Sequence, residues 1–183
     1  KKSYQVYPSR LNDRWFQGYK DISGDKIKLL YVGRVNPEKG IYNFLNIFDK
    51  INEDMEFSIV GNAKNLKVTN KKVKLLGYIS DPELLINAYD THNVMVLPSY
   101  TEAHPYVVDE CLARKRPVII FEDISYIVRG KRGIYICKRN VDSFLHTLNY
   151  IMKNFHLIQK DIEKNKLPKR EDMIKEFSRI LSG

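Results

Sequence analysis

The sequence is poor in cysteine, and its few histidines form no metal-binding pattern. Cys111 and Cys137 are its two cysteines; they make no CxxC pair, and no histidine lies near either at ligand spacing. The four histidines form no HxxxH or HExxH pair. We therefore expect no metal site, and we expect both cysteines to behave as small buried hydrophobic residues.

Long hydrophobic runs are also absent. No apolar stretch approaches the roughly 20 residues that a membrane-spanning helix needs, and the N-terminus carries no secretory signal. The start, which lacks methionine, is expected to be an internal position of a longer protein. With 43% hydrophobic and 29% charged residues over 183 positions, the chain is expected to fold as one globular domain. We expect a cytoplasmic location, peripheral at the inner face of the membrane.

Acidic residues are outnumbered, which leaves a formal net charge of +9. Cations gather at Lys71–Lys74, Arg114–Arg116 and Arg129–Arg132. No helix-turn-helix signature or RNP-like aromatic strand accompanies them, so nucleic acid is not an expected partner. Two interpretations remain open: a solvated basic surface, or a surface for an anionic partner such as nucleotide phosphates or anionic lipid.

The hydrophobic period switches repeatedly between strand-like and helix-like. Short apolar runs predict six strands, at residues 27–33, 57–61, 73–77, 93–97, 117–121 and 133–137. Helical spacing predicts helices at residues 41–51, 80–90, 105–114 and 140–151, and one or two charged helices within 156–181, broken near Leu167-Pro168. This alternation predicts an α/β fold, a Rossmann-like parallel sheet with helices on both faces.

The predicted sheet also fixes where a ligand is expected. Ligands of such folds bind beyond the carboxyl ends of the strands, so the loops after Val32, Val60, Leu76 and Leu97 are the ones of interest. We expect three segments: a linker over residues 1–26, a Rossmann-like ligand-binding domain over 27–155, and a helical tail over 156–183.

Two cations follow the first strand. Arg34 stands at its end, after Gly33, and Lys39 stands at the start of the next helix. The loop lacks the glycines of a dinucleotide fingerprint and the GK[ST] ending of a P-loop. A guanidinium fork and an ammonium there suit phosphate oxygens, although both could be ordinary surface charges.

Two glutamates flank the start of the helix after the fourth strand. Glu102 lies in the loop and Glu110 inside the helix that begins near His104. They could form a general acid/base pair, but the deeper carboxylate suits a ribose diol better. Alone, each could be a solvated charge or a helix stabiliser. We expect His104 to be a loop residue near the ligand rather than a catalytic base.

A glycine turn follows the third strand, over Gly77–Ser80. Its backbone could contact the edge of a base while Tyr78 or Ile79 packs on the ring. A plain strand-to-helix turn with a buried aromatic residue is the alternative.

Together these residues resemble glycosyltransferase family 4. The resemblance rests on Gly33-Arg34, Glu38-Lys39-Gly40, Val60-Gly61, Leu76-Gly77-Tyr78-Ile79-Ser80, Leu84, Tyr89, Pro98-Ser99, Glu102-x-x-Pro105, Glu110 and Pro117-Val118. It covers about residues 27–155 and corresponds to the donor-binding C-terminal domain of the two-domain GT-B fold. The acceptor-binding N-terminal domain is not part of this chain.

The resemblance implies a role for each residue. Arg34 and Lys39 would neutralise the donor diphosphate, and Glu110 would hold the ribose hydroxyls. Glu102 and the backbone of Ala103, His104, Pro105 and Tyr106 would contact the sugar, and the amides of Tyr106 and Val107 would reach phosphate. Gly33 would lie beside the donor, and the segment with Tyr78 and Ile79 would hold the base. Arg34, Lys39 and Glu102 are thus the expected catalytic residues.

The resemblance further implies a retaining transferase that needs no metal and no cofactor besides its NDP-sugar donor, UDP-sugar rather than GDP-sugar. The acceptor would be a cell-envelope component or another glycan, and an anionic membrane surface is an expected partner. A GT-B sugar-nucleotide epimerase and a non-catalytic nucleotide-binding module are the alternatives. The chain departs from the family at Cys111–Arg116, where small residues and glycine are usual, and at Ala103, where glycine is common.

Overall fold

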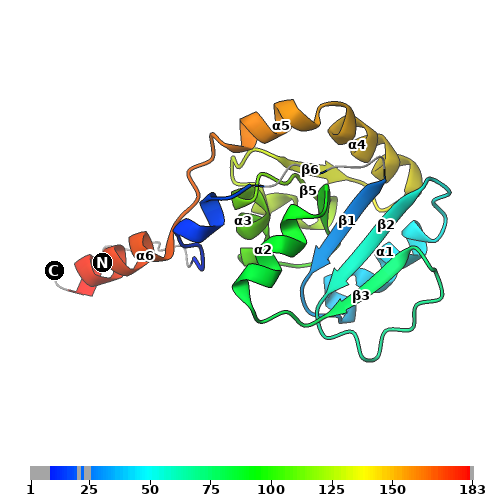
Figure 1. The fold of residues 1–183 in the computed structure, drawn as a ribbon, viewed down its shortest axis with the longest axis horizontal. Coiled ribbons are helices and arrows are strands. Elements are labelled where there is room, and N and C mark those ends of the chain that lie inside the picture. Colours follow the sequence, from blue (N-terminus) through cyan, green and yellow to red (C-terminus); the bar gives the residue numbers. More distant parts are fainter. Residues whose placement is uncertain (1–8, 20–21, 23–25, 182–183) are drawn as a thin grey trace.

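All six strands expected from the sequence lie in one parallel sheet, in the order β3-β2-β1-β4-β5-β6 (Figure 1). The computed structural model describes residues 9–19, 22 and 26–181. The strands are β1 (Ile27–Val32), β2 (Met55–Val60), β3 (Val73–Gly77), β4 (Val94–Leu97), β5 (Val118–Phe121) and β6 (Ile134–Cys137). The predicted α/β fold with a Rossmann-like sheet is therefore confirmed.

Helices connect the strands and cover both faces of the sheet, with α2 and α3 on one face and α1 on the other (Figure 1). The α-helices are α1 (Ile41–Phe48), α2 (Pro82–Asp90), α3 (Tyr106–Ala113), α4 (Val141–Lys153), α5 (Phe155–Ile162) and α6 (Arg170–Leu181). Three short 3-10 helices are η1 (Asp13–Phe16), η2 (Pro37–Lys39) and η3 (Glu122–Ile127).

Aromatic packing joins α1 to the sheet and to α4. The Phe44 ring on α1 lies 4.9 Å from Phe57 of β2 and 5.1 Å from Phe144 of α4, both edge to face. All three side chains are fully buried. Such pairs contribute roughly 0.5–1.5 kcal/mol beyond the area they bury, so α1 and α4 form one layer of the core.

Gly40 allows α1 to start very close to the end of β4. Its φ is +65°, and a Cβ atom there would lie 1.9 Å from the carbonyl oxygen of Pro98. Glycine alone tolerates both the left-handed conformation and this approach. The contact sets Lys39, at the end of η2, beside the loop that follows β4.

Polar side chains cap the starts of α2 and α4. The Asp81 carboxylate accepts from the amide of Glu83 at 2.7 Å, and the Asn140 side chain accepts from the amide of Ser143 at 2.8 Å. These acceptors satisfy amides that have no partner within the helix.

The basic cluster at Arg114–Arg116 is not a surface patch, because two of its cations are buried. Arg114 is 1% exposed and makes two 2.8 Å hydrogen bonds to the Asp90 carboxylate. It also donates to the carbonyl oxygens of Trp15, Gln17 and Gly18. Arg114 thus fixes the segment before β1 to the body of the fold, where the family usually has small residues.

The described part of the N-terminal segment, residues 9–19, packs against the domain. Trp15 is buried, and its ring lies 5.9 Å from that of Tyr89 on α2. The Leu11 carbonyl accepts from the amide of Arg170 at 2.8 Å, which joins this segment to the start of α6. Residues 1–8 of the expected linker lie outside the described residues.

The C-terminal tail divides as predicted, with α5 and α6 separated around Leu167-Pro168. Figure 1 shows α6 extending away from the body of the fold, and none of its residues from Arg170 to Leu181 is buried. Within residues 9–19, 22 and 26–181, no helix is long and apolar enough to cross a membrane.

Candidate functional site

A cleft of about 780 Å³ opens at the carboxyl edge of the sheet, as expected for this fold. It lies beyond the ends of β1, β2 and β4, next to the start of α3. The predicted site residues that line it are Gly33, Arg34, Lys39, Tyr78, Ile79, Glu102, His104, Pro105, Tyr106, Val107 and Glu110. Ala103 is exposed and is not among the lining residues.

The Tyr31 side chain holds the backbone of Arg34, the first cation of the cleft. Its hydroxyl donates to the carbonyl oxygen of Arg34 at 2.6 Å. A Cβ at Gly33 would lie 2.9 Å from that hydroxyl, so the backbone of residue 33 passes directly over the tyrosine. Burial raises the pKa of Tyr31 far above its usual value, and the Glu102 carboxylate raises it further. Tyr31 therefore stays a neutral donor that fixes the Arg34 backbone.

Lys39 and Glu102 form an ion pair within the cleft. The Lys39 Nζ lies 2.7 Å from Glu102 Oε1, and the side chains are 17% and 9% exposed. Ser99 Oγ donates to the same oxygen at 2.7 Å. Glu102 is thus an oriented acceptor, and it holds Lys39 at the edge where a ligand would enter.

Tyr126 fixes the backbone of Glu102 and could not be identified from the sequence. Its hydroxyl accepts from the Glu102 amide at 2.9 Å and donates to the Glu102 carbonyl oxygen at 2.6 Å. It comes from η3, an element without a clear sequence signal. Both backbone groups of the glutamate are therefore held by one phenol.

Arg139 supports the same loop from the segment after β6 and was likewise not predicted. Its guanidinium donates to the Ser99 carbonyl oxygen at 2.8 Å, forms an ion pair with Asp123 at 2.7 Å, and lies 4.0 Å from the centre of the Tyr100 ring. These contacts hold Ser99 in place, and the Ser99 hydroxyl in turn donates to the Glu102 carboxylate.

Glu110 lies deeper, on α3, and is 6% exposed. Its Oε2 accepts from the Tyr89 hydroxyl at 2.9 Å. Burial raises the pKa of Glu110, while the Tyr89 hydrogen bond and the nearby charge of Arg10 lower it. One carboxylate oxygen is thus held by the protein, in a cleft wide enough for a ligand to reach the carboxylate.

Arg10 is a third cation of the cleft, and it comes from the segment that the sequence indicated only as a linker. It lines the cleft, and its Cζ lies 5.0 Å from the centre of the Tyr106 ring. Its neighbours are anchored: Ser9 Oγ donates to the Pro168 carbonyl oxygen at 2.5 Å, and Leu11 is 1% exposed. No motif in the sequence would have identified it.

His104 belongs to a polar cluster behind the cleft. Its Nε2 lies 3.4 Å from Asp109 Oδ2, and Lys131 pairs with the other oxygen of that carboxylate. Burial lowers the pKa of His104, and the charges of Lys131 and Arg129 lower it further, although Asp109 opposes them. The cluster gives His104 a fixed position beside the cleft.

Tyr78 and Ile79 directly follow β3 and line the cleft. Tyr78 is 78% exposed, so the alternative of a buried aromatic residue in this turn is wrong. Ile79 is half-buried against the core. An exposed ring at the mouth of the cleft is available for stacking on a planar ligand.

The described residues contain no group of three or more His, Cys, Asp or Glu side chains that could hold a metal ion. The charged groups that line the cleft are Arg10, Arg34, Lys39, Glu102 and Glu110. Cations and carboxylates share the lining, a composition suited to a ligand that has both phosphate and hydroxyl groups.

Comparison with known proteins identifies the family. The family described as "Glycosyl transferases group 1" matches residues 26–154. The capsular polysaccharide biosynthesis glycosyltransferase CapM of Staphylococcus aureus is 26% identical over 143 residues, which cover 69% of this chain and 37% of CapM. An uncharacterized glycosyltransferase of Haemophilus influenzae is 25% identical over 170 residues, covering 84% of this chain and 48% of that protein. The chain thus spans half or less of these relatives.

Solved structures with the same fold include glycosyltransferases and a sucrose-phosphate synthase. The synthase, from Thermosynechococcus elongatus, superposes with a TM-score of 0.76 at 19% identity, covering 96% of this chain and 51% of the synthase. Anabaena HepE, solved in complex with UDP and glucose, gives a TM-score of 0.69 at 14% identity, covering 86% and 48% of the two chains. The fold and the extensive family match agree: the chain belongs to the group 1 glycosyltransferases.

Proposed function

We propose that this chain is the donor-binding part of a retaining, metal-independent glycosyltransferase that uses an NDP-sugar. One observation carries the proposal: Arg34 and Lys39 face the same cleft as Glu102 and Glu110, at the carboxyl edge of a Rossmann-like sheet. A UDP-sugar is the favoured donor, because HepE, which has the same fold, was solved with UDP and with UDP-glucose.

In this proposal the diphosphate lies between the two cations and the start of α3. Its charge increases as the sugar leaves, and each cation about 4 Å away contributes roughly 4 kcal/mol of gross attraction at an effective dielectric near 20. The amides at the start of α3 add the positive end of the helix dipole. These groups would replace a divalent ion, and the lack of a metal-binding cluster in the described residues is compatible with that.

The two glutamates have separate tasks. Glu110 binds the ribose hydroxyls, and Glu102 orients the hydroxyls of the sugar. An acceptor hydroxyl oxygen bonds to the anomeric carbon on the face from which the diphosphate departs, the bond from that carbon to the diphosphate oxygen breaks, and the hydroxyl proton passes to the leaving diphosphate. No protein nucleophile is needed.

The acceptor side is proposed from the relatives. CapM is named for capsular polysaccharide biosynthesis, so a cell-envelope or other glycan acceptor suits this chain. Since the chain spans half or less of its relatives, we assign acceptor binding chiefly to an N-terminal domain outside it.

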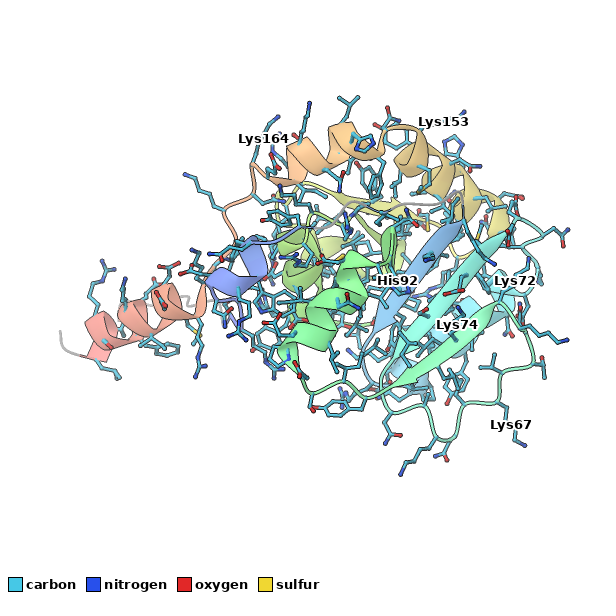
Figure 2. All side chains as sticks on the ribbon, in the orientation of Figure 1. Lys67, Lys72, Lys74, His92, Lys153 and Lys164 are labelled. Carbon is cyan, nitrogen blue, oxygen red and sulfur yellow. The ribbon has the colours of Figure 1, made fainter. Side chains whose placement is uncertain are left out.

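Peripheral association with an anionic membrane is part of the same proposal. The net charge is +9, and Lys67, Lys72 and Lys74 lie on the β3 side of the fold, with Lys67 on the loop before β3 (Figure 2). Lys72 donates to carbonyl oxygens and Lys74 pairs with Glu56, so exposed lysines such as Lys67 would carry the attraction. Co-sedimentation with phosphatidylglycerol vesicles, compared with neutral phosphatidylcholine vesicles, tests it; equal binding to both would remove this part.

Titration calorimetry with UDP, GDP and ADP tests the donor assignment. UDP is expected to bind most tightly, and R34A or K39A should each weaken it by about tenfold or more, as expected for a lost charge-assisted hydrogen bond. Unchanged UDP binding in both variants would refute the phosphate assignment. Conversion of the sugar of a UDP-sugar without an acceptor would instead indicate an epimerase.

A further inference from the structure

A second cavity, of about 350 Å³, shares His104 with the cleft described above. Two separate segments form its walls: residues 129–131 after η3 and residues 165–168 after α5. His104 lines both cavities, which makes them neighbours. Its size falls at the lower end of the range of small-molecule sites, about 300–1,000 Å³.

The charged side chains that line this cavity are all basic. Arg129, Lys131 and Lys166 line the cavity together with His104, and no carboxylate residue does. Asp109 is 2% exposed and pairs with Lys131, which fixes that lysine. Arg129 and Lys166 are two further cations of the lining.

Hydrogen bonds join the two segments that form the walls. The Asn165 side chain accepts from the Arg132 amide at 2.9 Å and donates to the Arg132 carbonyl oxygen at 2.9 Å. The chain turns at Arg129 and Gly130, whose φ angles are +44° and +72°. A left-handed conformation is uncommon at a residue other than glycine. The backbone segments that carry the cations are therefore held in a defined arrangement.

We propose that this cavity binds a phosphate group carried by the acceptor, an inference that rests on the glycosyltransferase function proposed above. Glu102, which orients the donor sugar in that proposal, is separated from His104 by a single residue. A group bound in this cavity would thus lie next to the sugar end of the donor cleft. A phosphate presents several oxygens and up to two charges, which suits a lining with cations on both of its walls.

A soluble phosphate ester and a phospholipid headgroup share this chemistry. The test begins with the soluble form: the ¹⁵N-labelled chain is saturated with UDP, and inorganic phosphate and then glycerol 3-phosphate are titrated in, with amide shifts followed by NMR. Saturable shifts at Gly130, Lys131, Asn165 and Lys166 are expected. A parallel titration with phosphatidic acid in phosphatidylcholine vesicles distinguishes the lipid source.

Variants separate the cavity from general surface charge. R129Q/K166Q is expected to weaken glycerol 3-phosphate binding by at least about tenfold, because each charge-assisted hydrogen bond to an ion contributes substantially. The matched control is K164Q: Lys164 is 62% exposed, pairs with Asp161 and lies outside the lining (Figure 2). The control should bind as the unmodified chain does.

Three results would overturn the proposal: no saturable shifts with either probe or with the vesicles, an equal loss in K164Q, or displacement of UDP by phosphate, which would make the cavity part of the donor site. If UDP itself fails to bind, the proposed donor function fails. The phosphate titration without UDP still reports on the cavity, so the two failures are distinguishable.

Discussion

Lys39 Nζ lies 2.7 Å from Glu102 Oε1, so the cation assigned to phosphate has an anionic partner within the protein. Ser99 holds the same carboxylate oxygen and keeps the pair in place. A diphosphate entering the cleft must therefore compete with Glu102 for the ammonium group.

Removing that competition should tighten nucleotide binding. E102Q is expected to lower the Kd for UDP by roughly fivefold, since an ion pair of this kind is worth about 1 kcal/mol. The same variant should lose the extra affinity that the sugar of UDP-glucose provides. Calorimetry with UDP and UDP-glucose measures both. E38Q, which removes an exposed charge next to Lys39, is the control, and weaker UDP binding by E102Q would contradict the competition.

The Tyr126 hydroxyl should matter for the sugar more than for the nucleotide. Y126F removes both hydrogen bonds to the Glu102 backbone, so UDP-glucose binding is expected to weaken by about tenfold while UDP binding changes little. The thermal midpoint should stay close to that of the unmodified chain, because Tyr126 is 52% exposed. Y42F, at an exposed tyrosine of α1, should change neither affinity. Equal losses for UDP and UDP-glucose would argue against the positioning role.

The Glu110 carboxylate should lower the folding stability at neutral pH while it supports the binding of UDP. Burial raises the pKa of Glu110 above its ordinary value of 4.5, so the folded state binds this proton more tightly than the unfolded state. Folding stability from this group is therefore present below pH 4.5 and lost as the pH rises through the raised pKa.

E110Q consequently has opposite effects on stability and function. At pH 7 it should unfold at an equal or higher temperature than the unmodified chain, and the difference should shrink toward pH 4. Its UDP affinity should fall by about tenfold, because the ribose loses a charged acceptor. Thermal scans across pH and calorimetry test this, and a large loss of stability at pH 7 would contradict it.

Arg10 should contribute to donor binding although it lies before the first strand. R10Q is expected to weaken UDP binding by about fivefold to tenfold, since it removes one of the three cations lining the cleft. R14Q is the matched control, because Arg14 is 58% exposed and pairs with Glu83 outside the cleft. Identical affinities of both variants would show that Arg10 has no part in binding.

Arg114 should be essential to stability rather than to binding. R114M leaves the Asp90 carboxylate buried without its partner and is expected to lower the free energy of unfolding by about 3–5 kcal/mol. R132M breaks an exposed pair with Asp161 and should cost no more than about 1 kcal/mol. Urea unfolding measures both, and the double variant D90L/R114M should recover part of the loss. A small effect of R114M would mean that water reaches Asp90.

The fold was predictable because the strands and the main helices have local signals in the sequence. The apolar runs of the strands, the helical spacing of Ile41, Phe44 and Phe48, and the caps at Asp81 and Asn140 are all short-range patterns. The parallel sheet then determines that Arg34 and Glu102 meet at one edge. Fold and cleft position could thus be inferred without coordinates.

The residues that were missed act through contacts distant in sequence. Arg10 lines the cleft from an apparent linker, whereas Tyr126 and Arg139 hold the backbone of the loop that carries Glu102. Each looks like an ordinary polar residue in its local sequence. Arg114 was read as part of a basic surface because its partner Asp90 and the carbonyl groups it binds lie far away along the chain. Such pairings follow from tertiary packing and have no periodic signature.

The Arg114 contacts also bear on how the family is divided into parts. Similarity to the group 1 glycosyltransferases starts at residue 26, yet the guanidinium takes three of its acceptors from residues 15, 17 and 18. A chain trimmed to the similarity boundary would leave a charged group inside the protein without those acceptors. The segment that folds as a unit is therefore expected to start before residue 26, where the family match begins.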